Sequence, residues 1–363
     1  MSRLTVTYRV RSDAASIEAR ARDIATEQSV EMPLAAIEDD FVKSEIVGRV
    51  EGVSDCGGGL FDVRITLSAA TVGEDAGQLL NMLFGNTSLH EDVVLADAEL
   101  PPDMLAPFGG PRAGAEGLRA RAGAPARALT CSALKPQGLS AAELGALAAR
   151  MAEGGLDFIK DDHGLADQDY STFGARLGAC AEAVRAANAR TGGRTRYVPS
   201  LSGSLERMRS QLALARVMGV DTVLITPMIA GWATMQDLVR THPDIAFIAH
   251  PAMAGAQIAP PLLAKLFRLL GADAVVFPSF GGRFGYSPQT CRAIARAALG
   301  DWHGLKPALP VPAGGMTLDR VPELLAFYGR DVMLLIGGSL LSAKERLTGE
   351  AAKFADAVRR HDT

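Results

Sequence analysis

Residues 154–163, with the sequence GGLDFIKDDH, hold the polar side chains whose types and spacing most favour chemistry. A glycine pair precedes a short apolar run that predicts a buried strand, and Lys160, Asp161, Asp162 and His163 end that strand. Because side chains at positions i and i+2 of a strand share a face, we expect Lys160 and Asp162 to point one way and Asp161 the other. An amine and a carboxylate that meet in a cavity pair with each other, bind a metal or take part in catalysis. The spacing leaves a structural salt bridge open as the alternative.

The elements that would position these side chains alternate regularly from residue 126 to residue 363. Eight apolar segments, separated by amphipathic helical patterns, predict strands at 128–134, 156–160, 196–201, 222–228, 246–251, 274–279, 308–314 and 332–338. Eight such units in about 230 residues have the usual size of a (β/α)8 TIM barrel. An open doubly wound sheet is the alternative, but no GxGxxG motif follows the first strand. We therefore predict an α/β chain whose C-terminal domain, 126–363, is a catalytic barrel.

A barrel of this kind carries its functional side chains at the carboxyl ends of the strands. The polar side chains expected there, besides those of 160–163, are Lys135, Gln137, His250 and Arg283. Glycine pairs follow the last two predicted strands, as Gly314, Gly315, Gly337 and Gly338. Backbone N–H groups of such glycines can approach phosphate oxygens closely, which predicts a phosphate site. Ordinary tight turns are the alternative.

Residues 1–125 follow a less regular pattern, which predicts a separate domain. Alternating or apolar runs at 4–10, 40–55, 60–68 and 93–101 predict strands, and 17–28 and 76–86 predict helices. Strands and helices interleaved in this way predict a small α+β domain of the ferredoxin-like type. The segment 101–125 is rich in proline, glycine and alanine and is expected to be a connector.

The composition excludes several classes of protein. Of 363 residues, 48% are hydrophobic and 21% charged, as in an ordinary globular protein. The net charge of −4 without a basic block argues against nucleic-acid binding, and no apolar run has the length of a membrane span. The first ten residues read as a strand, not a signal peptide. Four scattered cysteines without a CxxC motif indicate free thiols and a cytoplasmic protein.

Two motifs resemble those of the RuBisCO large subunit, and more narrowly those of the RuBisCO-like proteins. GGLDFIKDDH at the second barrel strand resembles GGLDFxKDDE, and CSALKPQGLS at the first resembles a motif of the type TIKPKLGLS. The AGG and GGS turns at the last two strands resemble the family's SGG and GGG turns. The resemblance covers the small N-terminal domain and the whole barrel.

The resemblance implies a metal site at the second strand. In the family the lysine of this strand takes up CO2 as a carbamate, which binds Mg²⁺ together with the following Asp and Glu. Lys160 and Asp162 keep these parts, whereas His163 stands where the Glu belongs. Because Mg²⁺ prefers oxygen ligands, its affinity should fall, or the site should select another divalent ion that tolerates nitrogen.

The other candidate residues also follow from the resemblance. Lys135 matches the lysine that acts as acid or base, and His250 matches a histidine of the fifth strand. The second lysine of the first strand is Gln137, Pro251 replaces a phosphate-binding arginine, and Arg283 is the nearest cation to the family's missing loop lysine. The family's site lies between two subunits. A homodimer is therefore implied, with Glu27 and Asn86 entering the partner's site.

These departures argue against carboxylation of a bisphosphate, because the second phosphate would lose its charged partner. The expected substrate is a small phosphorylated sugar acid. The expected reaction is an enolisation-based lyase or hydrolase step of the 3-oxo-isoapionate 4-phosphate decarboxylase or hydrolase type. A methylthioribulose-phosphate isomerase or enolase is the alternative. A third interpretation is that the chain is a non-catalytic RuBisCO-like scaffold, which would bind no ion at residues 160–163.

Overall fold

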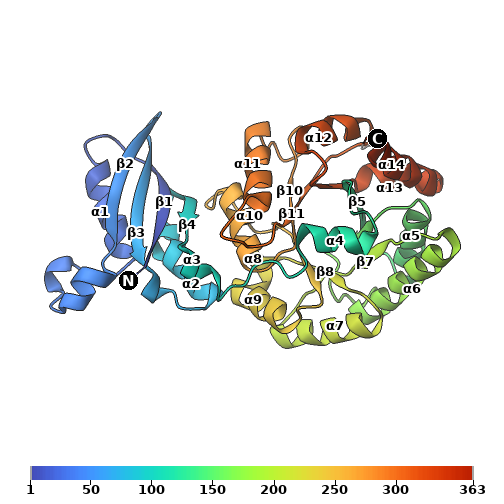
Figure 1. The fold of residues 1–363 in the computed structure, drawn as a ribbon, viewed down its shortest axis with the longest axis horizontal. Coiled ribbons are helices and arrows are strands. Elements are labelled where there is room, and N and C mark those ends of the chain that lie inside the picture. The colour runs from blue at the N-terminus through green and yellow to red at the C-terminus, as the bar shows by residue number, and fades with distance from the viewer. Residues whose placement is uncertain (1, 362–363) are drawn as a thin grey trace.

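A computed structural model describes residues 2–361, in which an N-terminal sheet domain lies beside a C-terminal barrel (Figure 1). The elements of the first domain are β1 Arg3–Arg11, α1 Ile17–Glu27, β2 Arg49–Gly57, β3 Leu60–Ser68, α2 Ala76–Phe84 and β4 Val93–Glu99. Its antiparallel sheet has the order β2-β3-β1-β4. This is the ferredoxin-like arrangement that the sequence predicts.

The period of two in β1 explains how this sheet holds its helices. Leu4, Val6, Tyr8 and Val10 are buried, while the residues between them are at least partly exposed. The Tyr8 hydroxyl donates to a carbonyl of α2, so one face of the sheet packs against the helices. The strand expected at 40–55 begins only at β2, because its first part forms a wide helical turn. Short helical turns in this domain are Leu34–Ala36, Val42–Ile46, Ala69–Thr71 and Asn86–Leu89.

All eight predicted barrel strands are present and parallel. They are β5 Leu129–Leu134, β6 Phe158–Asp161, β7 Arg196–Val198, β8 Thr222–Ile225, β9 Ala246–Ala249, β10 Ala274–Pro278, β11 Leu309–Ala313 and β12 Met333–Leu335. Hydrogen-bonded ladders join them in two groups, β12-β5-β6-β7 and β8-β9-β10-β11. A parallel bridge between Ser200 and Leu224 connects β7 to β8, and β11 lies against β12. The predicted barrel is confirmed.

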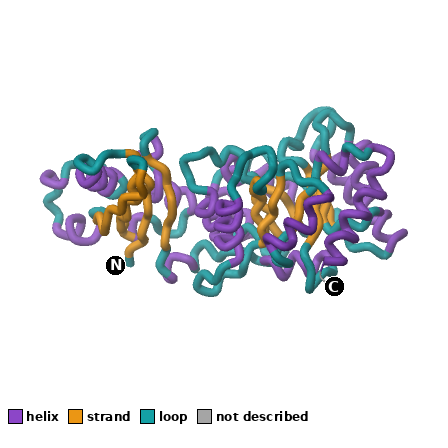
Figure 2. The backbone as a smooth tube through the Cα atoms, turned by 90° about the horizontal axis from the view of Figure 1, so that it is seen from above, coloured by secondary structure: helices purple, strands orange, loops and turns teal. Residues whose placement is uncertain are grey.

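The barrel helices lie around these strands (Figure 1), and Figure 2 shows helices on both sides of them. They are α5 Ala141–Glu153, α6 Phe173–Thr191, α7 Leu205–Val217, α8 Pro227–Ala230, α9 Trp232–Thr241, α10 Pro260–Leu269, α11 Pro288–Leu299, α12 Val321–Tyr328, α13 Gly338–Leu341 and α14 Leu347–His361. Further helical turns lie at Leu318–Arg320 and Lys344–Arg346. Alternate strand residues face the interior, such as Leu224, or the helices, such as Val223. Within residues 2–361, no helix combines the length and the apolar character needed to cross a bilayer.

The segment 101–125, expected to be a connector, contains two helices, α3 Pro102–Leu105 and α4 Gly114–Ala122. Ala115 and Leu118 of α4 are buried in one cluster with the interior residues Leu129 and Phe158 of the barrel. α4 therefore packs as part of the barrel, although composition places it before the boundary predicted at residue 125. Small side chains give this segment both its loop-like composition and its close packing.

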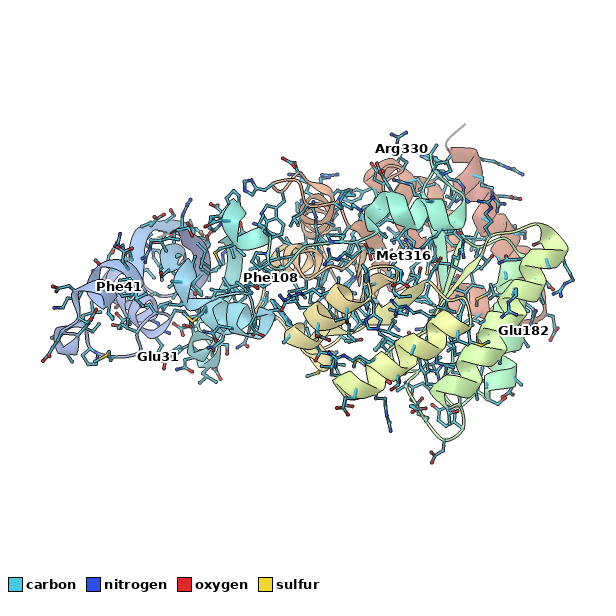
Figure 3. The ribbon with its side chains drawn as sticks, turned by 60° about the horizontal axis from the view of Figure 1, so that its bottom comes forward. Glu31, Phe41, Phe108, Glu182, Met316 and Arg330 are labelled. Atoms are coloured by element: carbon cyan, nitrogen blue, oxygen red, sulfur yellow. The ribbon has the colours of Figure 1, made fainter. Side chains whose placement is uncertain are left out.

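Hydrogen bonds to backbone groups join the two domains. Leu95 of β4 donates to Gln257 and accepts from Ala259, in a loop of the barrel. Gln236 of α9 bonds the backbone at Glu74 and Ala76. Phe108, labelled in Figure 3, is buried where the chain passes from one domain to the other. The N-terminal domain is thus docked on the β9–β10 side of the barrel.

Candidate active site

The end of β6 brings Lys160 and Asp162 together, as their spacing predicts. Lys160 is 2% exposed, and its Nζ donates to the backbone oxygen of Asp161 at 2.8 Å. The same nitrogen lies 3.9 Å from Oδ1 of Asp162. These two side chains lie at the carboxyl ends of the strands, which form the functional end of a barrel.

Asp161 points to the other side of β6 and has a structural part. Its carboxylate accepts from Nε of Arg176 at 2.9 Å, from the Tyr197 hydroxyl at 2.7 Å and from the Ser200 amide at 3.1 Å. Asp161 and Arg176 have no exposed side-chain surface. This network fixes the end of β6 from behind and leaves Lys160 and Asp162 free to face the barrel mouth.

Lys135 reaches the same carboxylate from the neighbouring strand. Its Nζ lies 3.3 Å from Oδ2 of Asp162, so two lysines meet one carboxylate. The register of β5 against β6 pairs Ala133 with Lys160, which places Lys135 just beyond the ladder. A Cβ added at Gly337 would stand 3.9 Å from Cε of Lys135. The glycine turn after β12 therefore adjoins the cluster of Lys135, Lys160 and Asp162.

Burial and charge shift the ionisation of this cluster. Burial lowers the pKa of the Lys160 amine, and the carboxylate of Asp162 opposes that shift. Burial alone would raise the pKa of Asp162, but His163 and the two lysine charges together hold it well below its usual range. Asp162 is thus a permanent anion, and Lys160 gives up its proton more readily than an exposed lysine.

Two histidine rings complete the mouth. His163 and His250, which follows β9, are stacked with centroids 4.2 Å apart and planes 12° apart. Nδ1 of His163 lies 3.5 Å from Asp162, and Nδ1 of His250 accepts from the Ala252 amide at 3.2 Å. Burial, assisted by the charge of Lys160, lowers the pKa of His250 from 6.5 to about 3. His250 is therefore neutral at physiological pH.

The lowered pKa of His250 predicts acid sensitivity of the metal-free protein. Between pH 6.5 and about 3 the unfolded chain protonates this ring and the folded chain does not. Acidification through that window should lower the free energy of unfolding by up to about 1.4 kcal/mol per pH unit, with no such contribution above it. Urea unfolding of wild type and His250→Gln at several pH values measures this. The variant should show a shallower slope, and exposed His90→Gln should not; equal slopes for wild type and His250→Gln would contradict the prediction.

The glycine turn after β11 is shaped for close backbone approach. Gly314 and Gly315 have φ angles of 86° and 88°, which disfavour residues with a Cβ. The loop after β10 packs against this turn. The Arg283 backbone amide donates a hydrogen bond to the Gly314 oxygen at 3.2 Å, and a Cβ at Gly282 would clash with the same oxygen. The turns of β11 and β12 thus lie on neighbouring strands, as a phosphate cradle requires.

The remaining sequence candidates lie at varying distances from this cluster. The Gln137 side-chain amide packs against Gly164 so closely that a Cβ at position 164 would clash with it. Gln137 therefore lies beside the loop that carries His163. The Arg283 guanidinium is stacked over Phe284 at 4.9 Å. In the N-terminal domain, Nδ2 of Asn86 donates to Oε1 of Glu27 at 2.9 Å. The roles expected for these four residues stay predictions.

Sequence reasoning missed the residues that support the site from behind, chiefly Arg176. The available signal was an arginine on the apolar face of a helix, between Phe173, Leu177 and Cys180. A buried cation at such a position needs a buried anion, and Asp161 was the carboxylate without an assigned partner.

The unmodified side chains do not form an ordinary magnesium site. Among residues 2–361, no three histidine, cysteine or carboxylate side chains gather closely enough to hold an ion. Among the described residues, Asp162 is the carboxylate that forms an ion pair with Lys160, and the charges of the two lysines oppose a cation. A carbamate on Lys160 would replace a positive charge by a negative one and add oxygen donors. The donor set would then fit a divalent ion.

Comparisons with known proteins identify the family and the fold of the chain. The family described as "Ribulose bisphosphate carboxylase large chain, catalytic domain" matches residues 114–357. A 5-methylthioribulose-1-phosphate isomerase of Rhodospirillum rubrum is 62% identical over 359 residues, 98% of this chain and 96% of that protein. Ribulose bisphosphate carboxylase-like protein 1 of Rhodopseudomonas palustris is 56% identical over 99% of this chain and 98% of its own. The crystal structure of a Rubisco-like protein from Rhodopseudomonas palustris superposes with a TM-score of 0.93, at 52% identity, over 99% of this chain and 98% of that one.

Proposed function

The chain belongs to the ribulose bisphosphate carboxylase large-chain family, as a RuBisCO-like enzyme of enediolate chemistry, and from that membership we propose that it isomerises a methylthioribulose phosphate. The observation that carries the proposal is the cluster of Lys135, Lys160 and Asp162 at the barrel mouth. The 62% identity to the isomerase of Rhodospirillum rubrum supports the substrate class. The sequence alone favours a sugar-acid phosphate as the substrate, but none of the relatives named above supports it. The alternative given there, a methylthioribulose phosphate, is therefore proposed instead.

The proposed reaction moves a carbonyl group along the sugar chain. The C–H bond at the hydroxyl-bearing carbon next to the carbonyl breaks, its proton passes to a base, and its electron pair forms the enediolate double bond. The proton returns to the former carbonyl carbon. The neighbouring hydroxyl loses its own proton and becomes the carbonyl, and the former carbonyl oxygen takes up a proton and becomes the hydroxyl. Lys135 is the proposed proton carrier, since it projects into the mouth and Asp162 holds its Nζ. No atom is gained or lost, as isomerisation requires.

The same site is not equipped for carboxylation. The residue after His250 is Pro251, so the arginine that would hold a second phosphate is absent. The loop 279–287 after β10 contains no lysine to polarise an incoming carboxylate. The proposal therefore requires one phosphate, at the turns of β11 and β12, and no gaseous co-substrate.

We further propose that CO2 on Lys160 completes a metal site with Asp162 and His163. The lowered pKa of Lys160 supports this, because only the neutral amine attacks CO2. A bound divalent ion would stabilise the negative charge that develops on the substrate oxygens. Mg²⁺ is the family's usual ion, and the imidazole favours a more nitrogen-tolerant one.

The imidazole makes a prediction about metal choice. In His163→Glu an anionic oxygen ligand replaces a nitrogen ligand, so Mg²⁺ should bind about 10-fold more tightly or better, which is about 1.4 kcal/mol. Isothermal titration in bicarbonate buffer measures the affinity. His163→Gln, which adds a neutral oxygen, should not give this gain. Unchanged Mg²⁺ affinity in His163→Glu would remove His163 from the ligand set.

The N-terminal domain supports the homodimer that the sequence implies. Glu27 and Asn86 are hydrogen-bonded to each other at the surface of this domain. Met32, Leu34 and Phe41 of the same domain are 40–50% exposed, and Figure 3 shows Phe41 at the end of the molecule remote from the barrel. We propose that this apolar surface docks on a second copy and brings Glu27 and Asn86 to its site. The free cysteines support a reducing, cytoplasmic setting.

One experiment tests the isomerase proposal directly. The purified protein is incubated with 5-methylthioribulose 1-phosphate, Mg²⁺ and bicarbonate in D2O, and the sugar phosphates are followed by NMR. A new ketose phosphate that carries solvent deuterium is the expected result. Absence of both product and deuterium exchange would refute the isomerase and favour the scaffold reading. Turnover of a 3-oxo-isoapionate phosphate instead would restore the sugar-acid function.

A further inference from the structure

The loop after β10, residues 279–287, packs against the glycine turn after β11 at main-chain distance. The Arg283 backbone nitrogen donates to the Gly314 oxygen at 3.2 Å, and a Cβ added at Gly315 would stand 3.1 Å from the same nitrogen. A Cβ added at Gly314 would stand 2.9 Å from the ring of Phe284. The loop therefore touches both glycines, and its conformation decides how freely the turn can move.

The turn needs such support because it consists of two glycines in succession. Gly314 and Gly315 both have φ angles in the left-handed region, and glycine loses more conformational entropy on becoming ordered than any other residue. A phosphate that binds the amides of a mobile turn must also supply the free energy that orders the turn. A turn already fixed by its neighbour binds the same phosphate more tightly. The loop after β10 can therefore set phosphate affinity without touching the phosphate.

Arg320 ends the helical turn before α12 and holds the start of this loop. Its Nη1 donates to the Phe280 carbonyl at 3.1 Å, and its guanidinium lies over the Phe280 ring, 5.2 Å from the centroid. Gly281, with a φ angle of 66°, leaves room for the guanidinium, because a Cβ there would stand 2.8 Å from Nη1. Two hydrogen bonds to the Glu323 carboxylate, at 2.9 and 3.1 Å, fix the guanidinium itself. One side chain thus contacts the ring, the carbonyl and the glycine at the start of the loop.

We propose that Arg320 is a positioning residue for the substrate phosphate. By fixing the loop after β10 on the turn of Gly314 and Gly315, Arg320 preorganises the amides of that turn. The inference rests on the phosphate site of the proposed function, but not on which phosphorylated ketose the enzyme uses. The lysines of the reacting cluster belong to β5 and β6, so loss of Arg320 should weaken phosphate binding and leave the chemical step intact.

Two arginine variants of the full-length protein test this assignment with inorganic phosphate as the probe. Arg320→Met removes the guanidinium. Arg292→Met is the matched control, because Arg292 lies over Phe327, whose ring packs against Phe280 in the same aromatic cluster. Phosphorus NMR titration measures the Kd. Ordering the backbone of one residue on binding weakens affinity about 10-fold, so Arg320→Met should raise the Kd by about that factor or more. Arg292→Met should change it less than about 2-fold.

Three further measurements distinguish positioning from a merely structural role. Arg320→Lys, which can still donate to the Phe280 carbonyl, should recover part of the affinity. Gly315→Ala strains the turn itself and should abolish phosphate binding, which would locate the bound phosphate there. With 5-methylthioribulose 1-phosphate, Arg320→Met should raise KM by the same factor as the Kd, while kcat changes less than about 2-fold. A purely structural Arg320 would lower the urea midpoint and leave the Kd and KM unchanged.

The outcomes separate this inference from the isomerase proposal. An equal Kd in wild type and folded Arg320→Met, or an equal loss in Arg292→Met, would overturn the role of Arg320 while the isomerase stands. A wild-type protein that binds no inorganic phosphate would overturn it together with the phosphate site. Phosphate binding that depends on Arg320, without turnover of the ketose, would support it although the isomerase fails. An unfolded Arg320→Met is replaced by Glu323→Gln, which should also raise the Kd; an unchanged Kd there would overturn the inference.

Discussion

Lys160→Met should abolish turnover and bicarbonate-dependent metal binding together. Methionine keeps the apolar stem of the side chain but cannot form a carbamate. The site would retain one carboxylate and His163, so the divalent ion should lose its binding site. Loss of the proposed carbamate should lower kcat/KM by about 10³-fold or more, because this group would bind the metal and could move protons. Metal titration with and without bicarbonate, and the NMR assay, measure the two effects.

Lys135→Met is the matched control for this result. It removes the second lysine beside Asp162, so turnover should also fail. Metal binding should still respond to bicarbonate, since Lys160 is intact. Because burial lowers the pKa of Lys160, the proposed activation by CO2 should begin at a lower pH than an exposed lysine allows. A Lys160→Met enzyme that keeps its metal response would show that Lys160 is not the carbamate site.

The barrel could be predicted because each strand is a short apolar run between helices of clear periodicity. The residue at which each strand ends could not be predicted in the same way. The run 222–228 predicts a strand three residues longer than β8, because Pro227 is buried but begins α8 instead of extending the ladder. Composition also concealed α4, whose alanines and glycines read as a connector and pack tightly against the barrel. Burial and strand pairing therefore decided where each element ends.

The site could be predicted where it depends on neighbours in sequence. The alternation of side chains along β6 is local, so the opposite directions of Asp161 and Asp162 followed from spacing alone. The partners of those carboxylates are not local. Arg176 and Tyr197 come from a helix and a strand that only the closed barrel brings to Asp161. The charges around Lys160 likewise depend on the register of β5 against β6.

The buried pair of Asp161 and Arg176 predicts the largest effect on stability. Besides pairing with Asp161, Arg176 donates to the carbonyls of Ser171 at 2.8 Å and Ala166 at 2.6 Å. Arg176→Met would leave a buried carboxylate without its cation and two carbonyls without these donors. Breaking a buried pair on one side costs about 3–5 kcal/mol, so the free energy of unfolding should fall by that amount in urea titrations. Arg185→Met, on an exposed part of the same helix, should change it by less than about 0.5 kcal/mol.

A double variant separates the charge from the packing. In the double variant Asp161→Asn with Arg176→Met, no buried carboxylate is left without a cation. The side-chain amide at position 161 can still form hydrogen bonds with Tyr197 and Ser200. The double variant should therefore be more stable than the sum of the single losses, by about 1–3 kcal/mol. Asp161 lies between Lys160 and Asp162, so loss of its partner should let the end of β6 move. Arg176→Met should therefore also have a lower turnover, even at temperatures where the variant stays folded. A loss in Arg176→Met no larger than that in Arg185→Met would show that the pair does not anchor this strand.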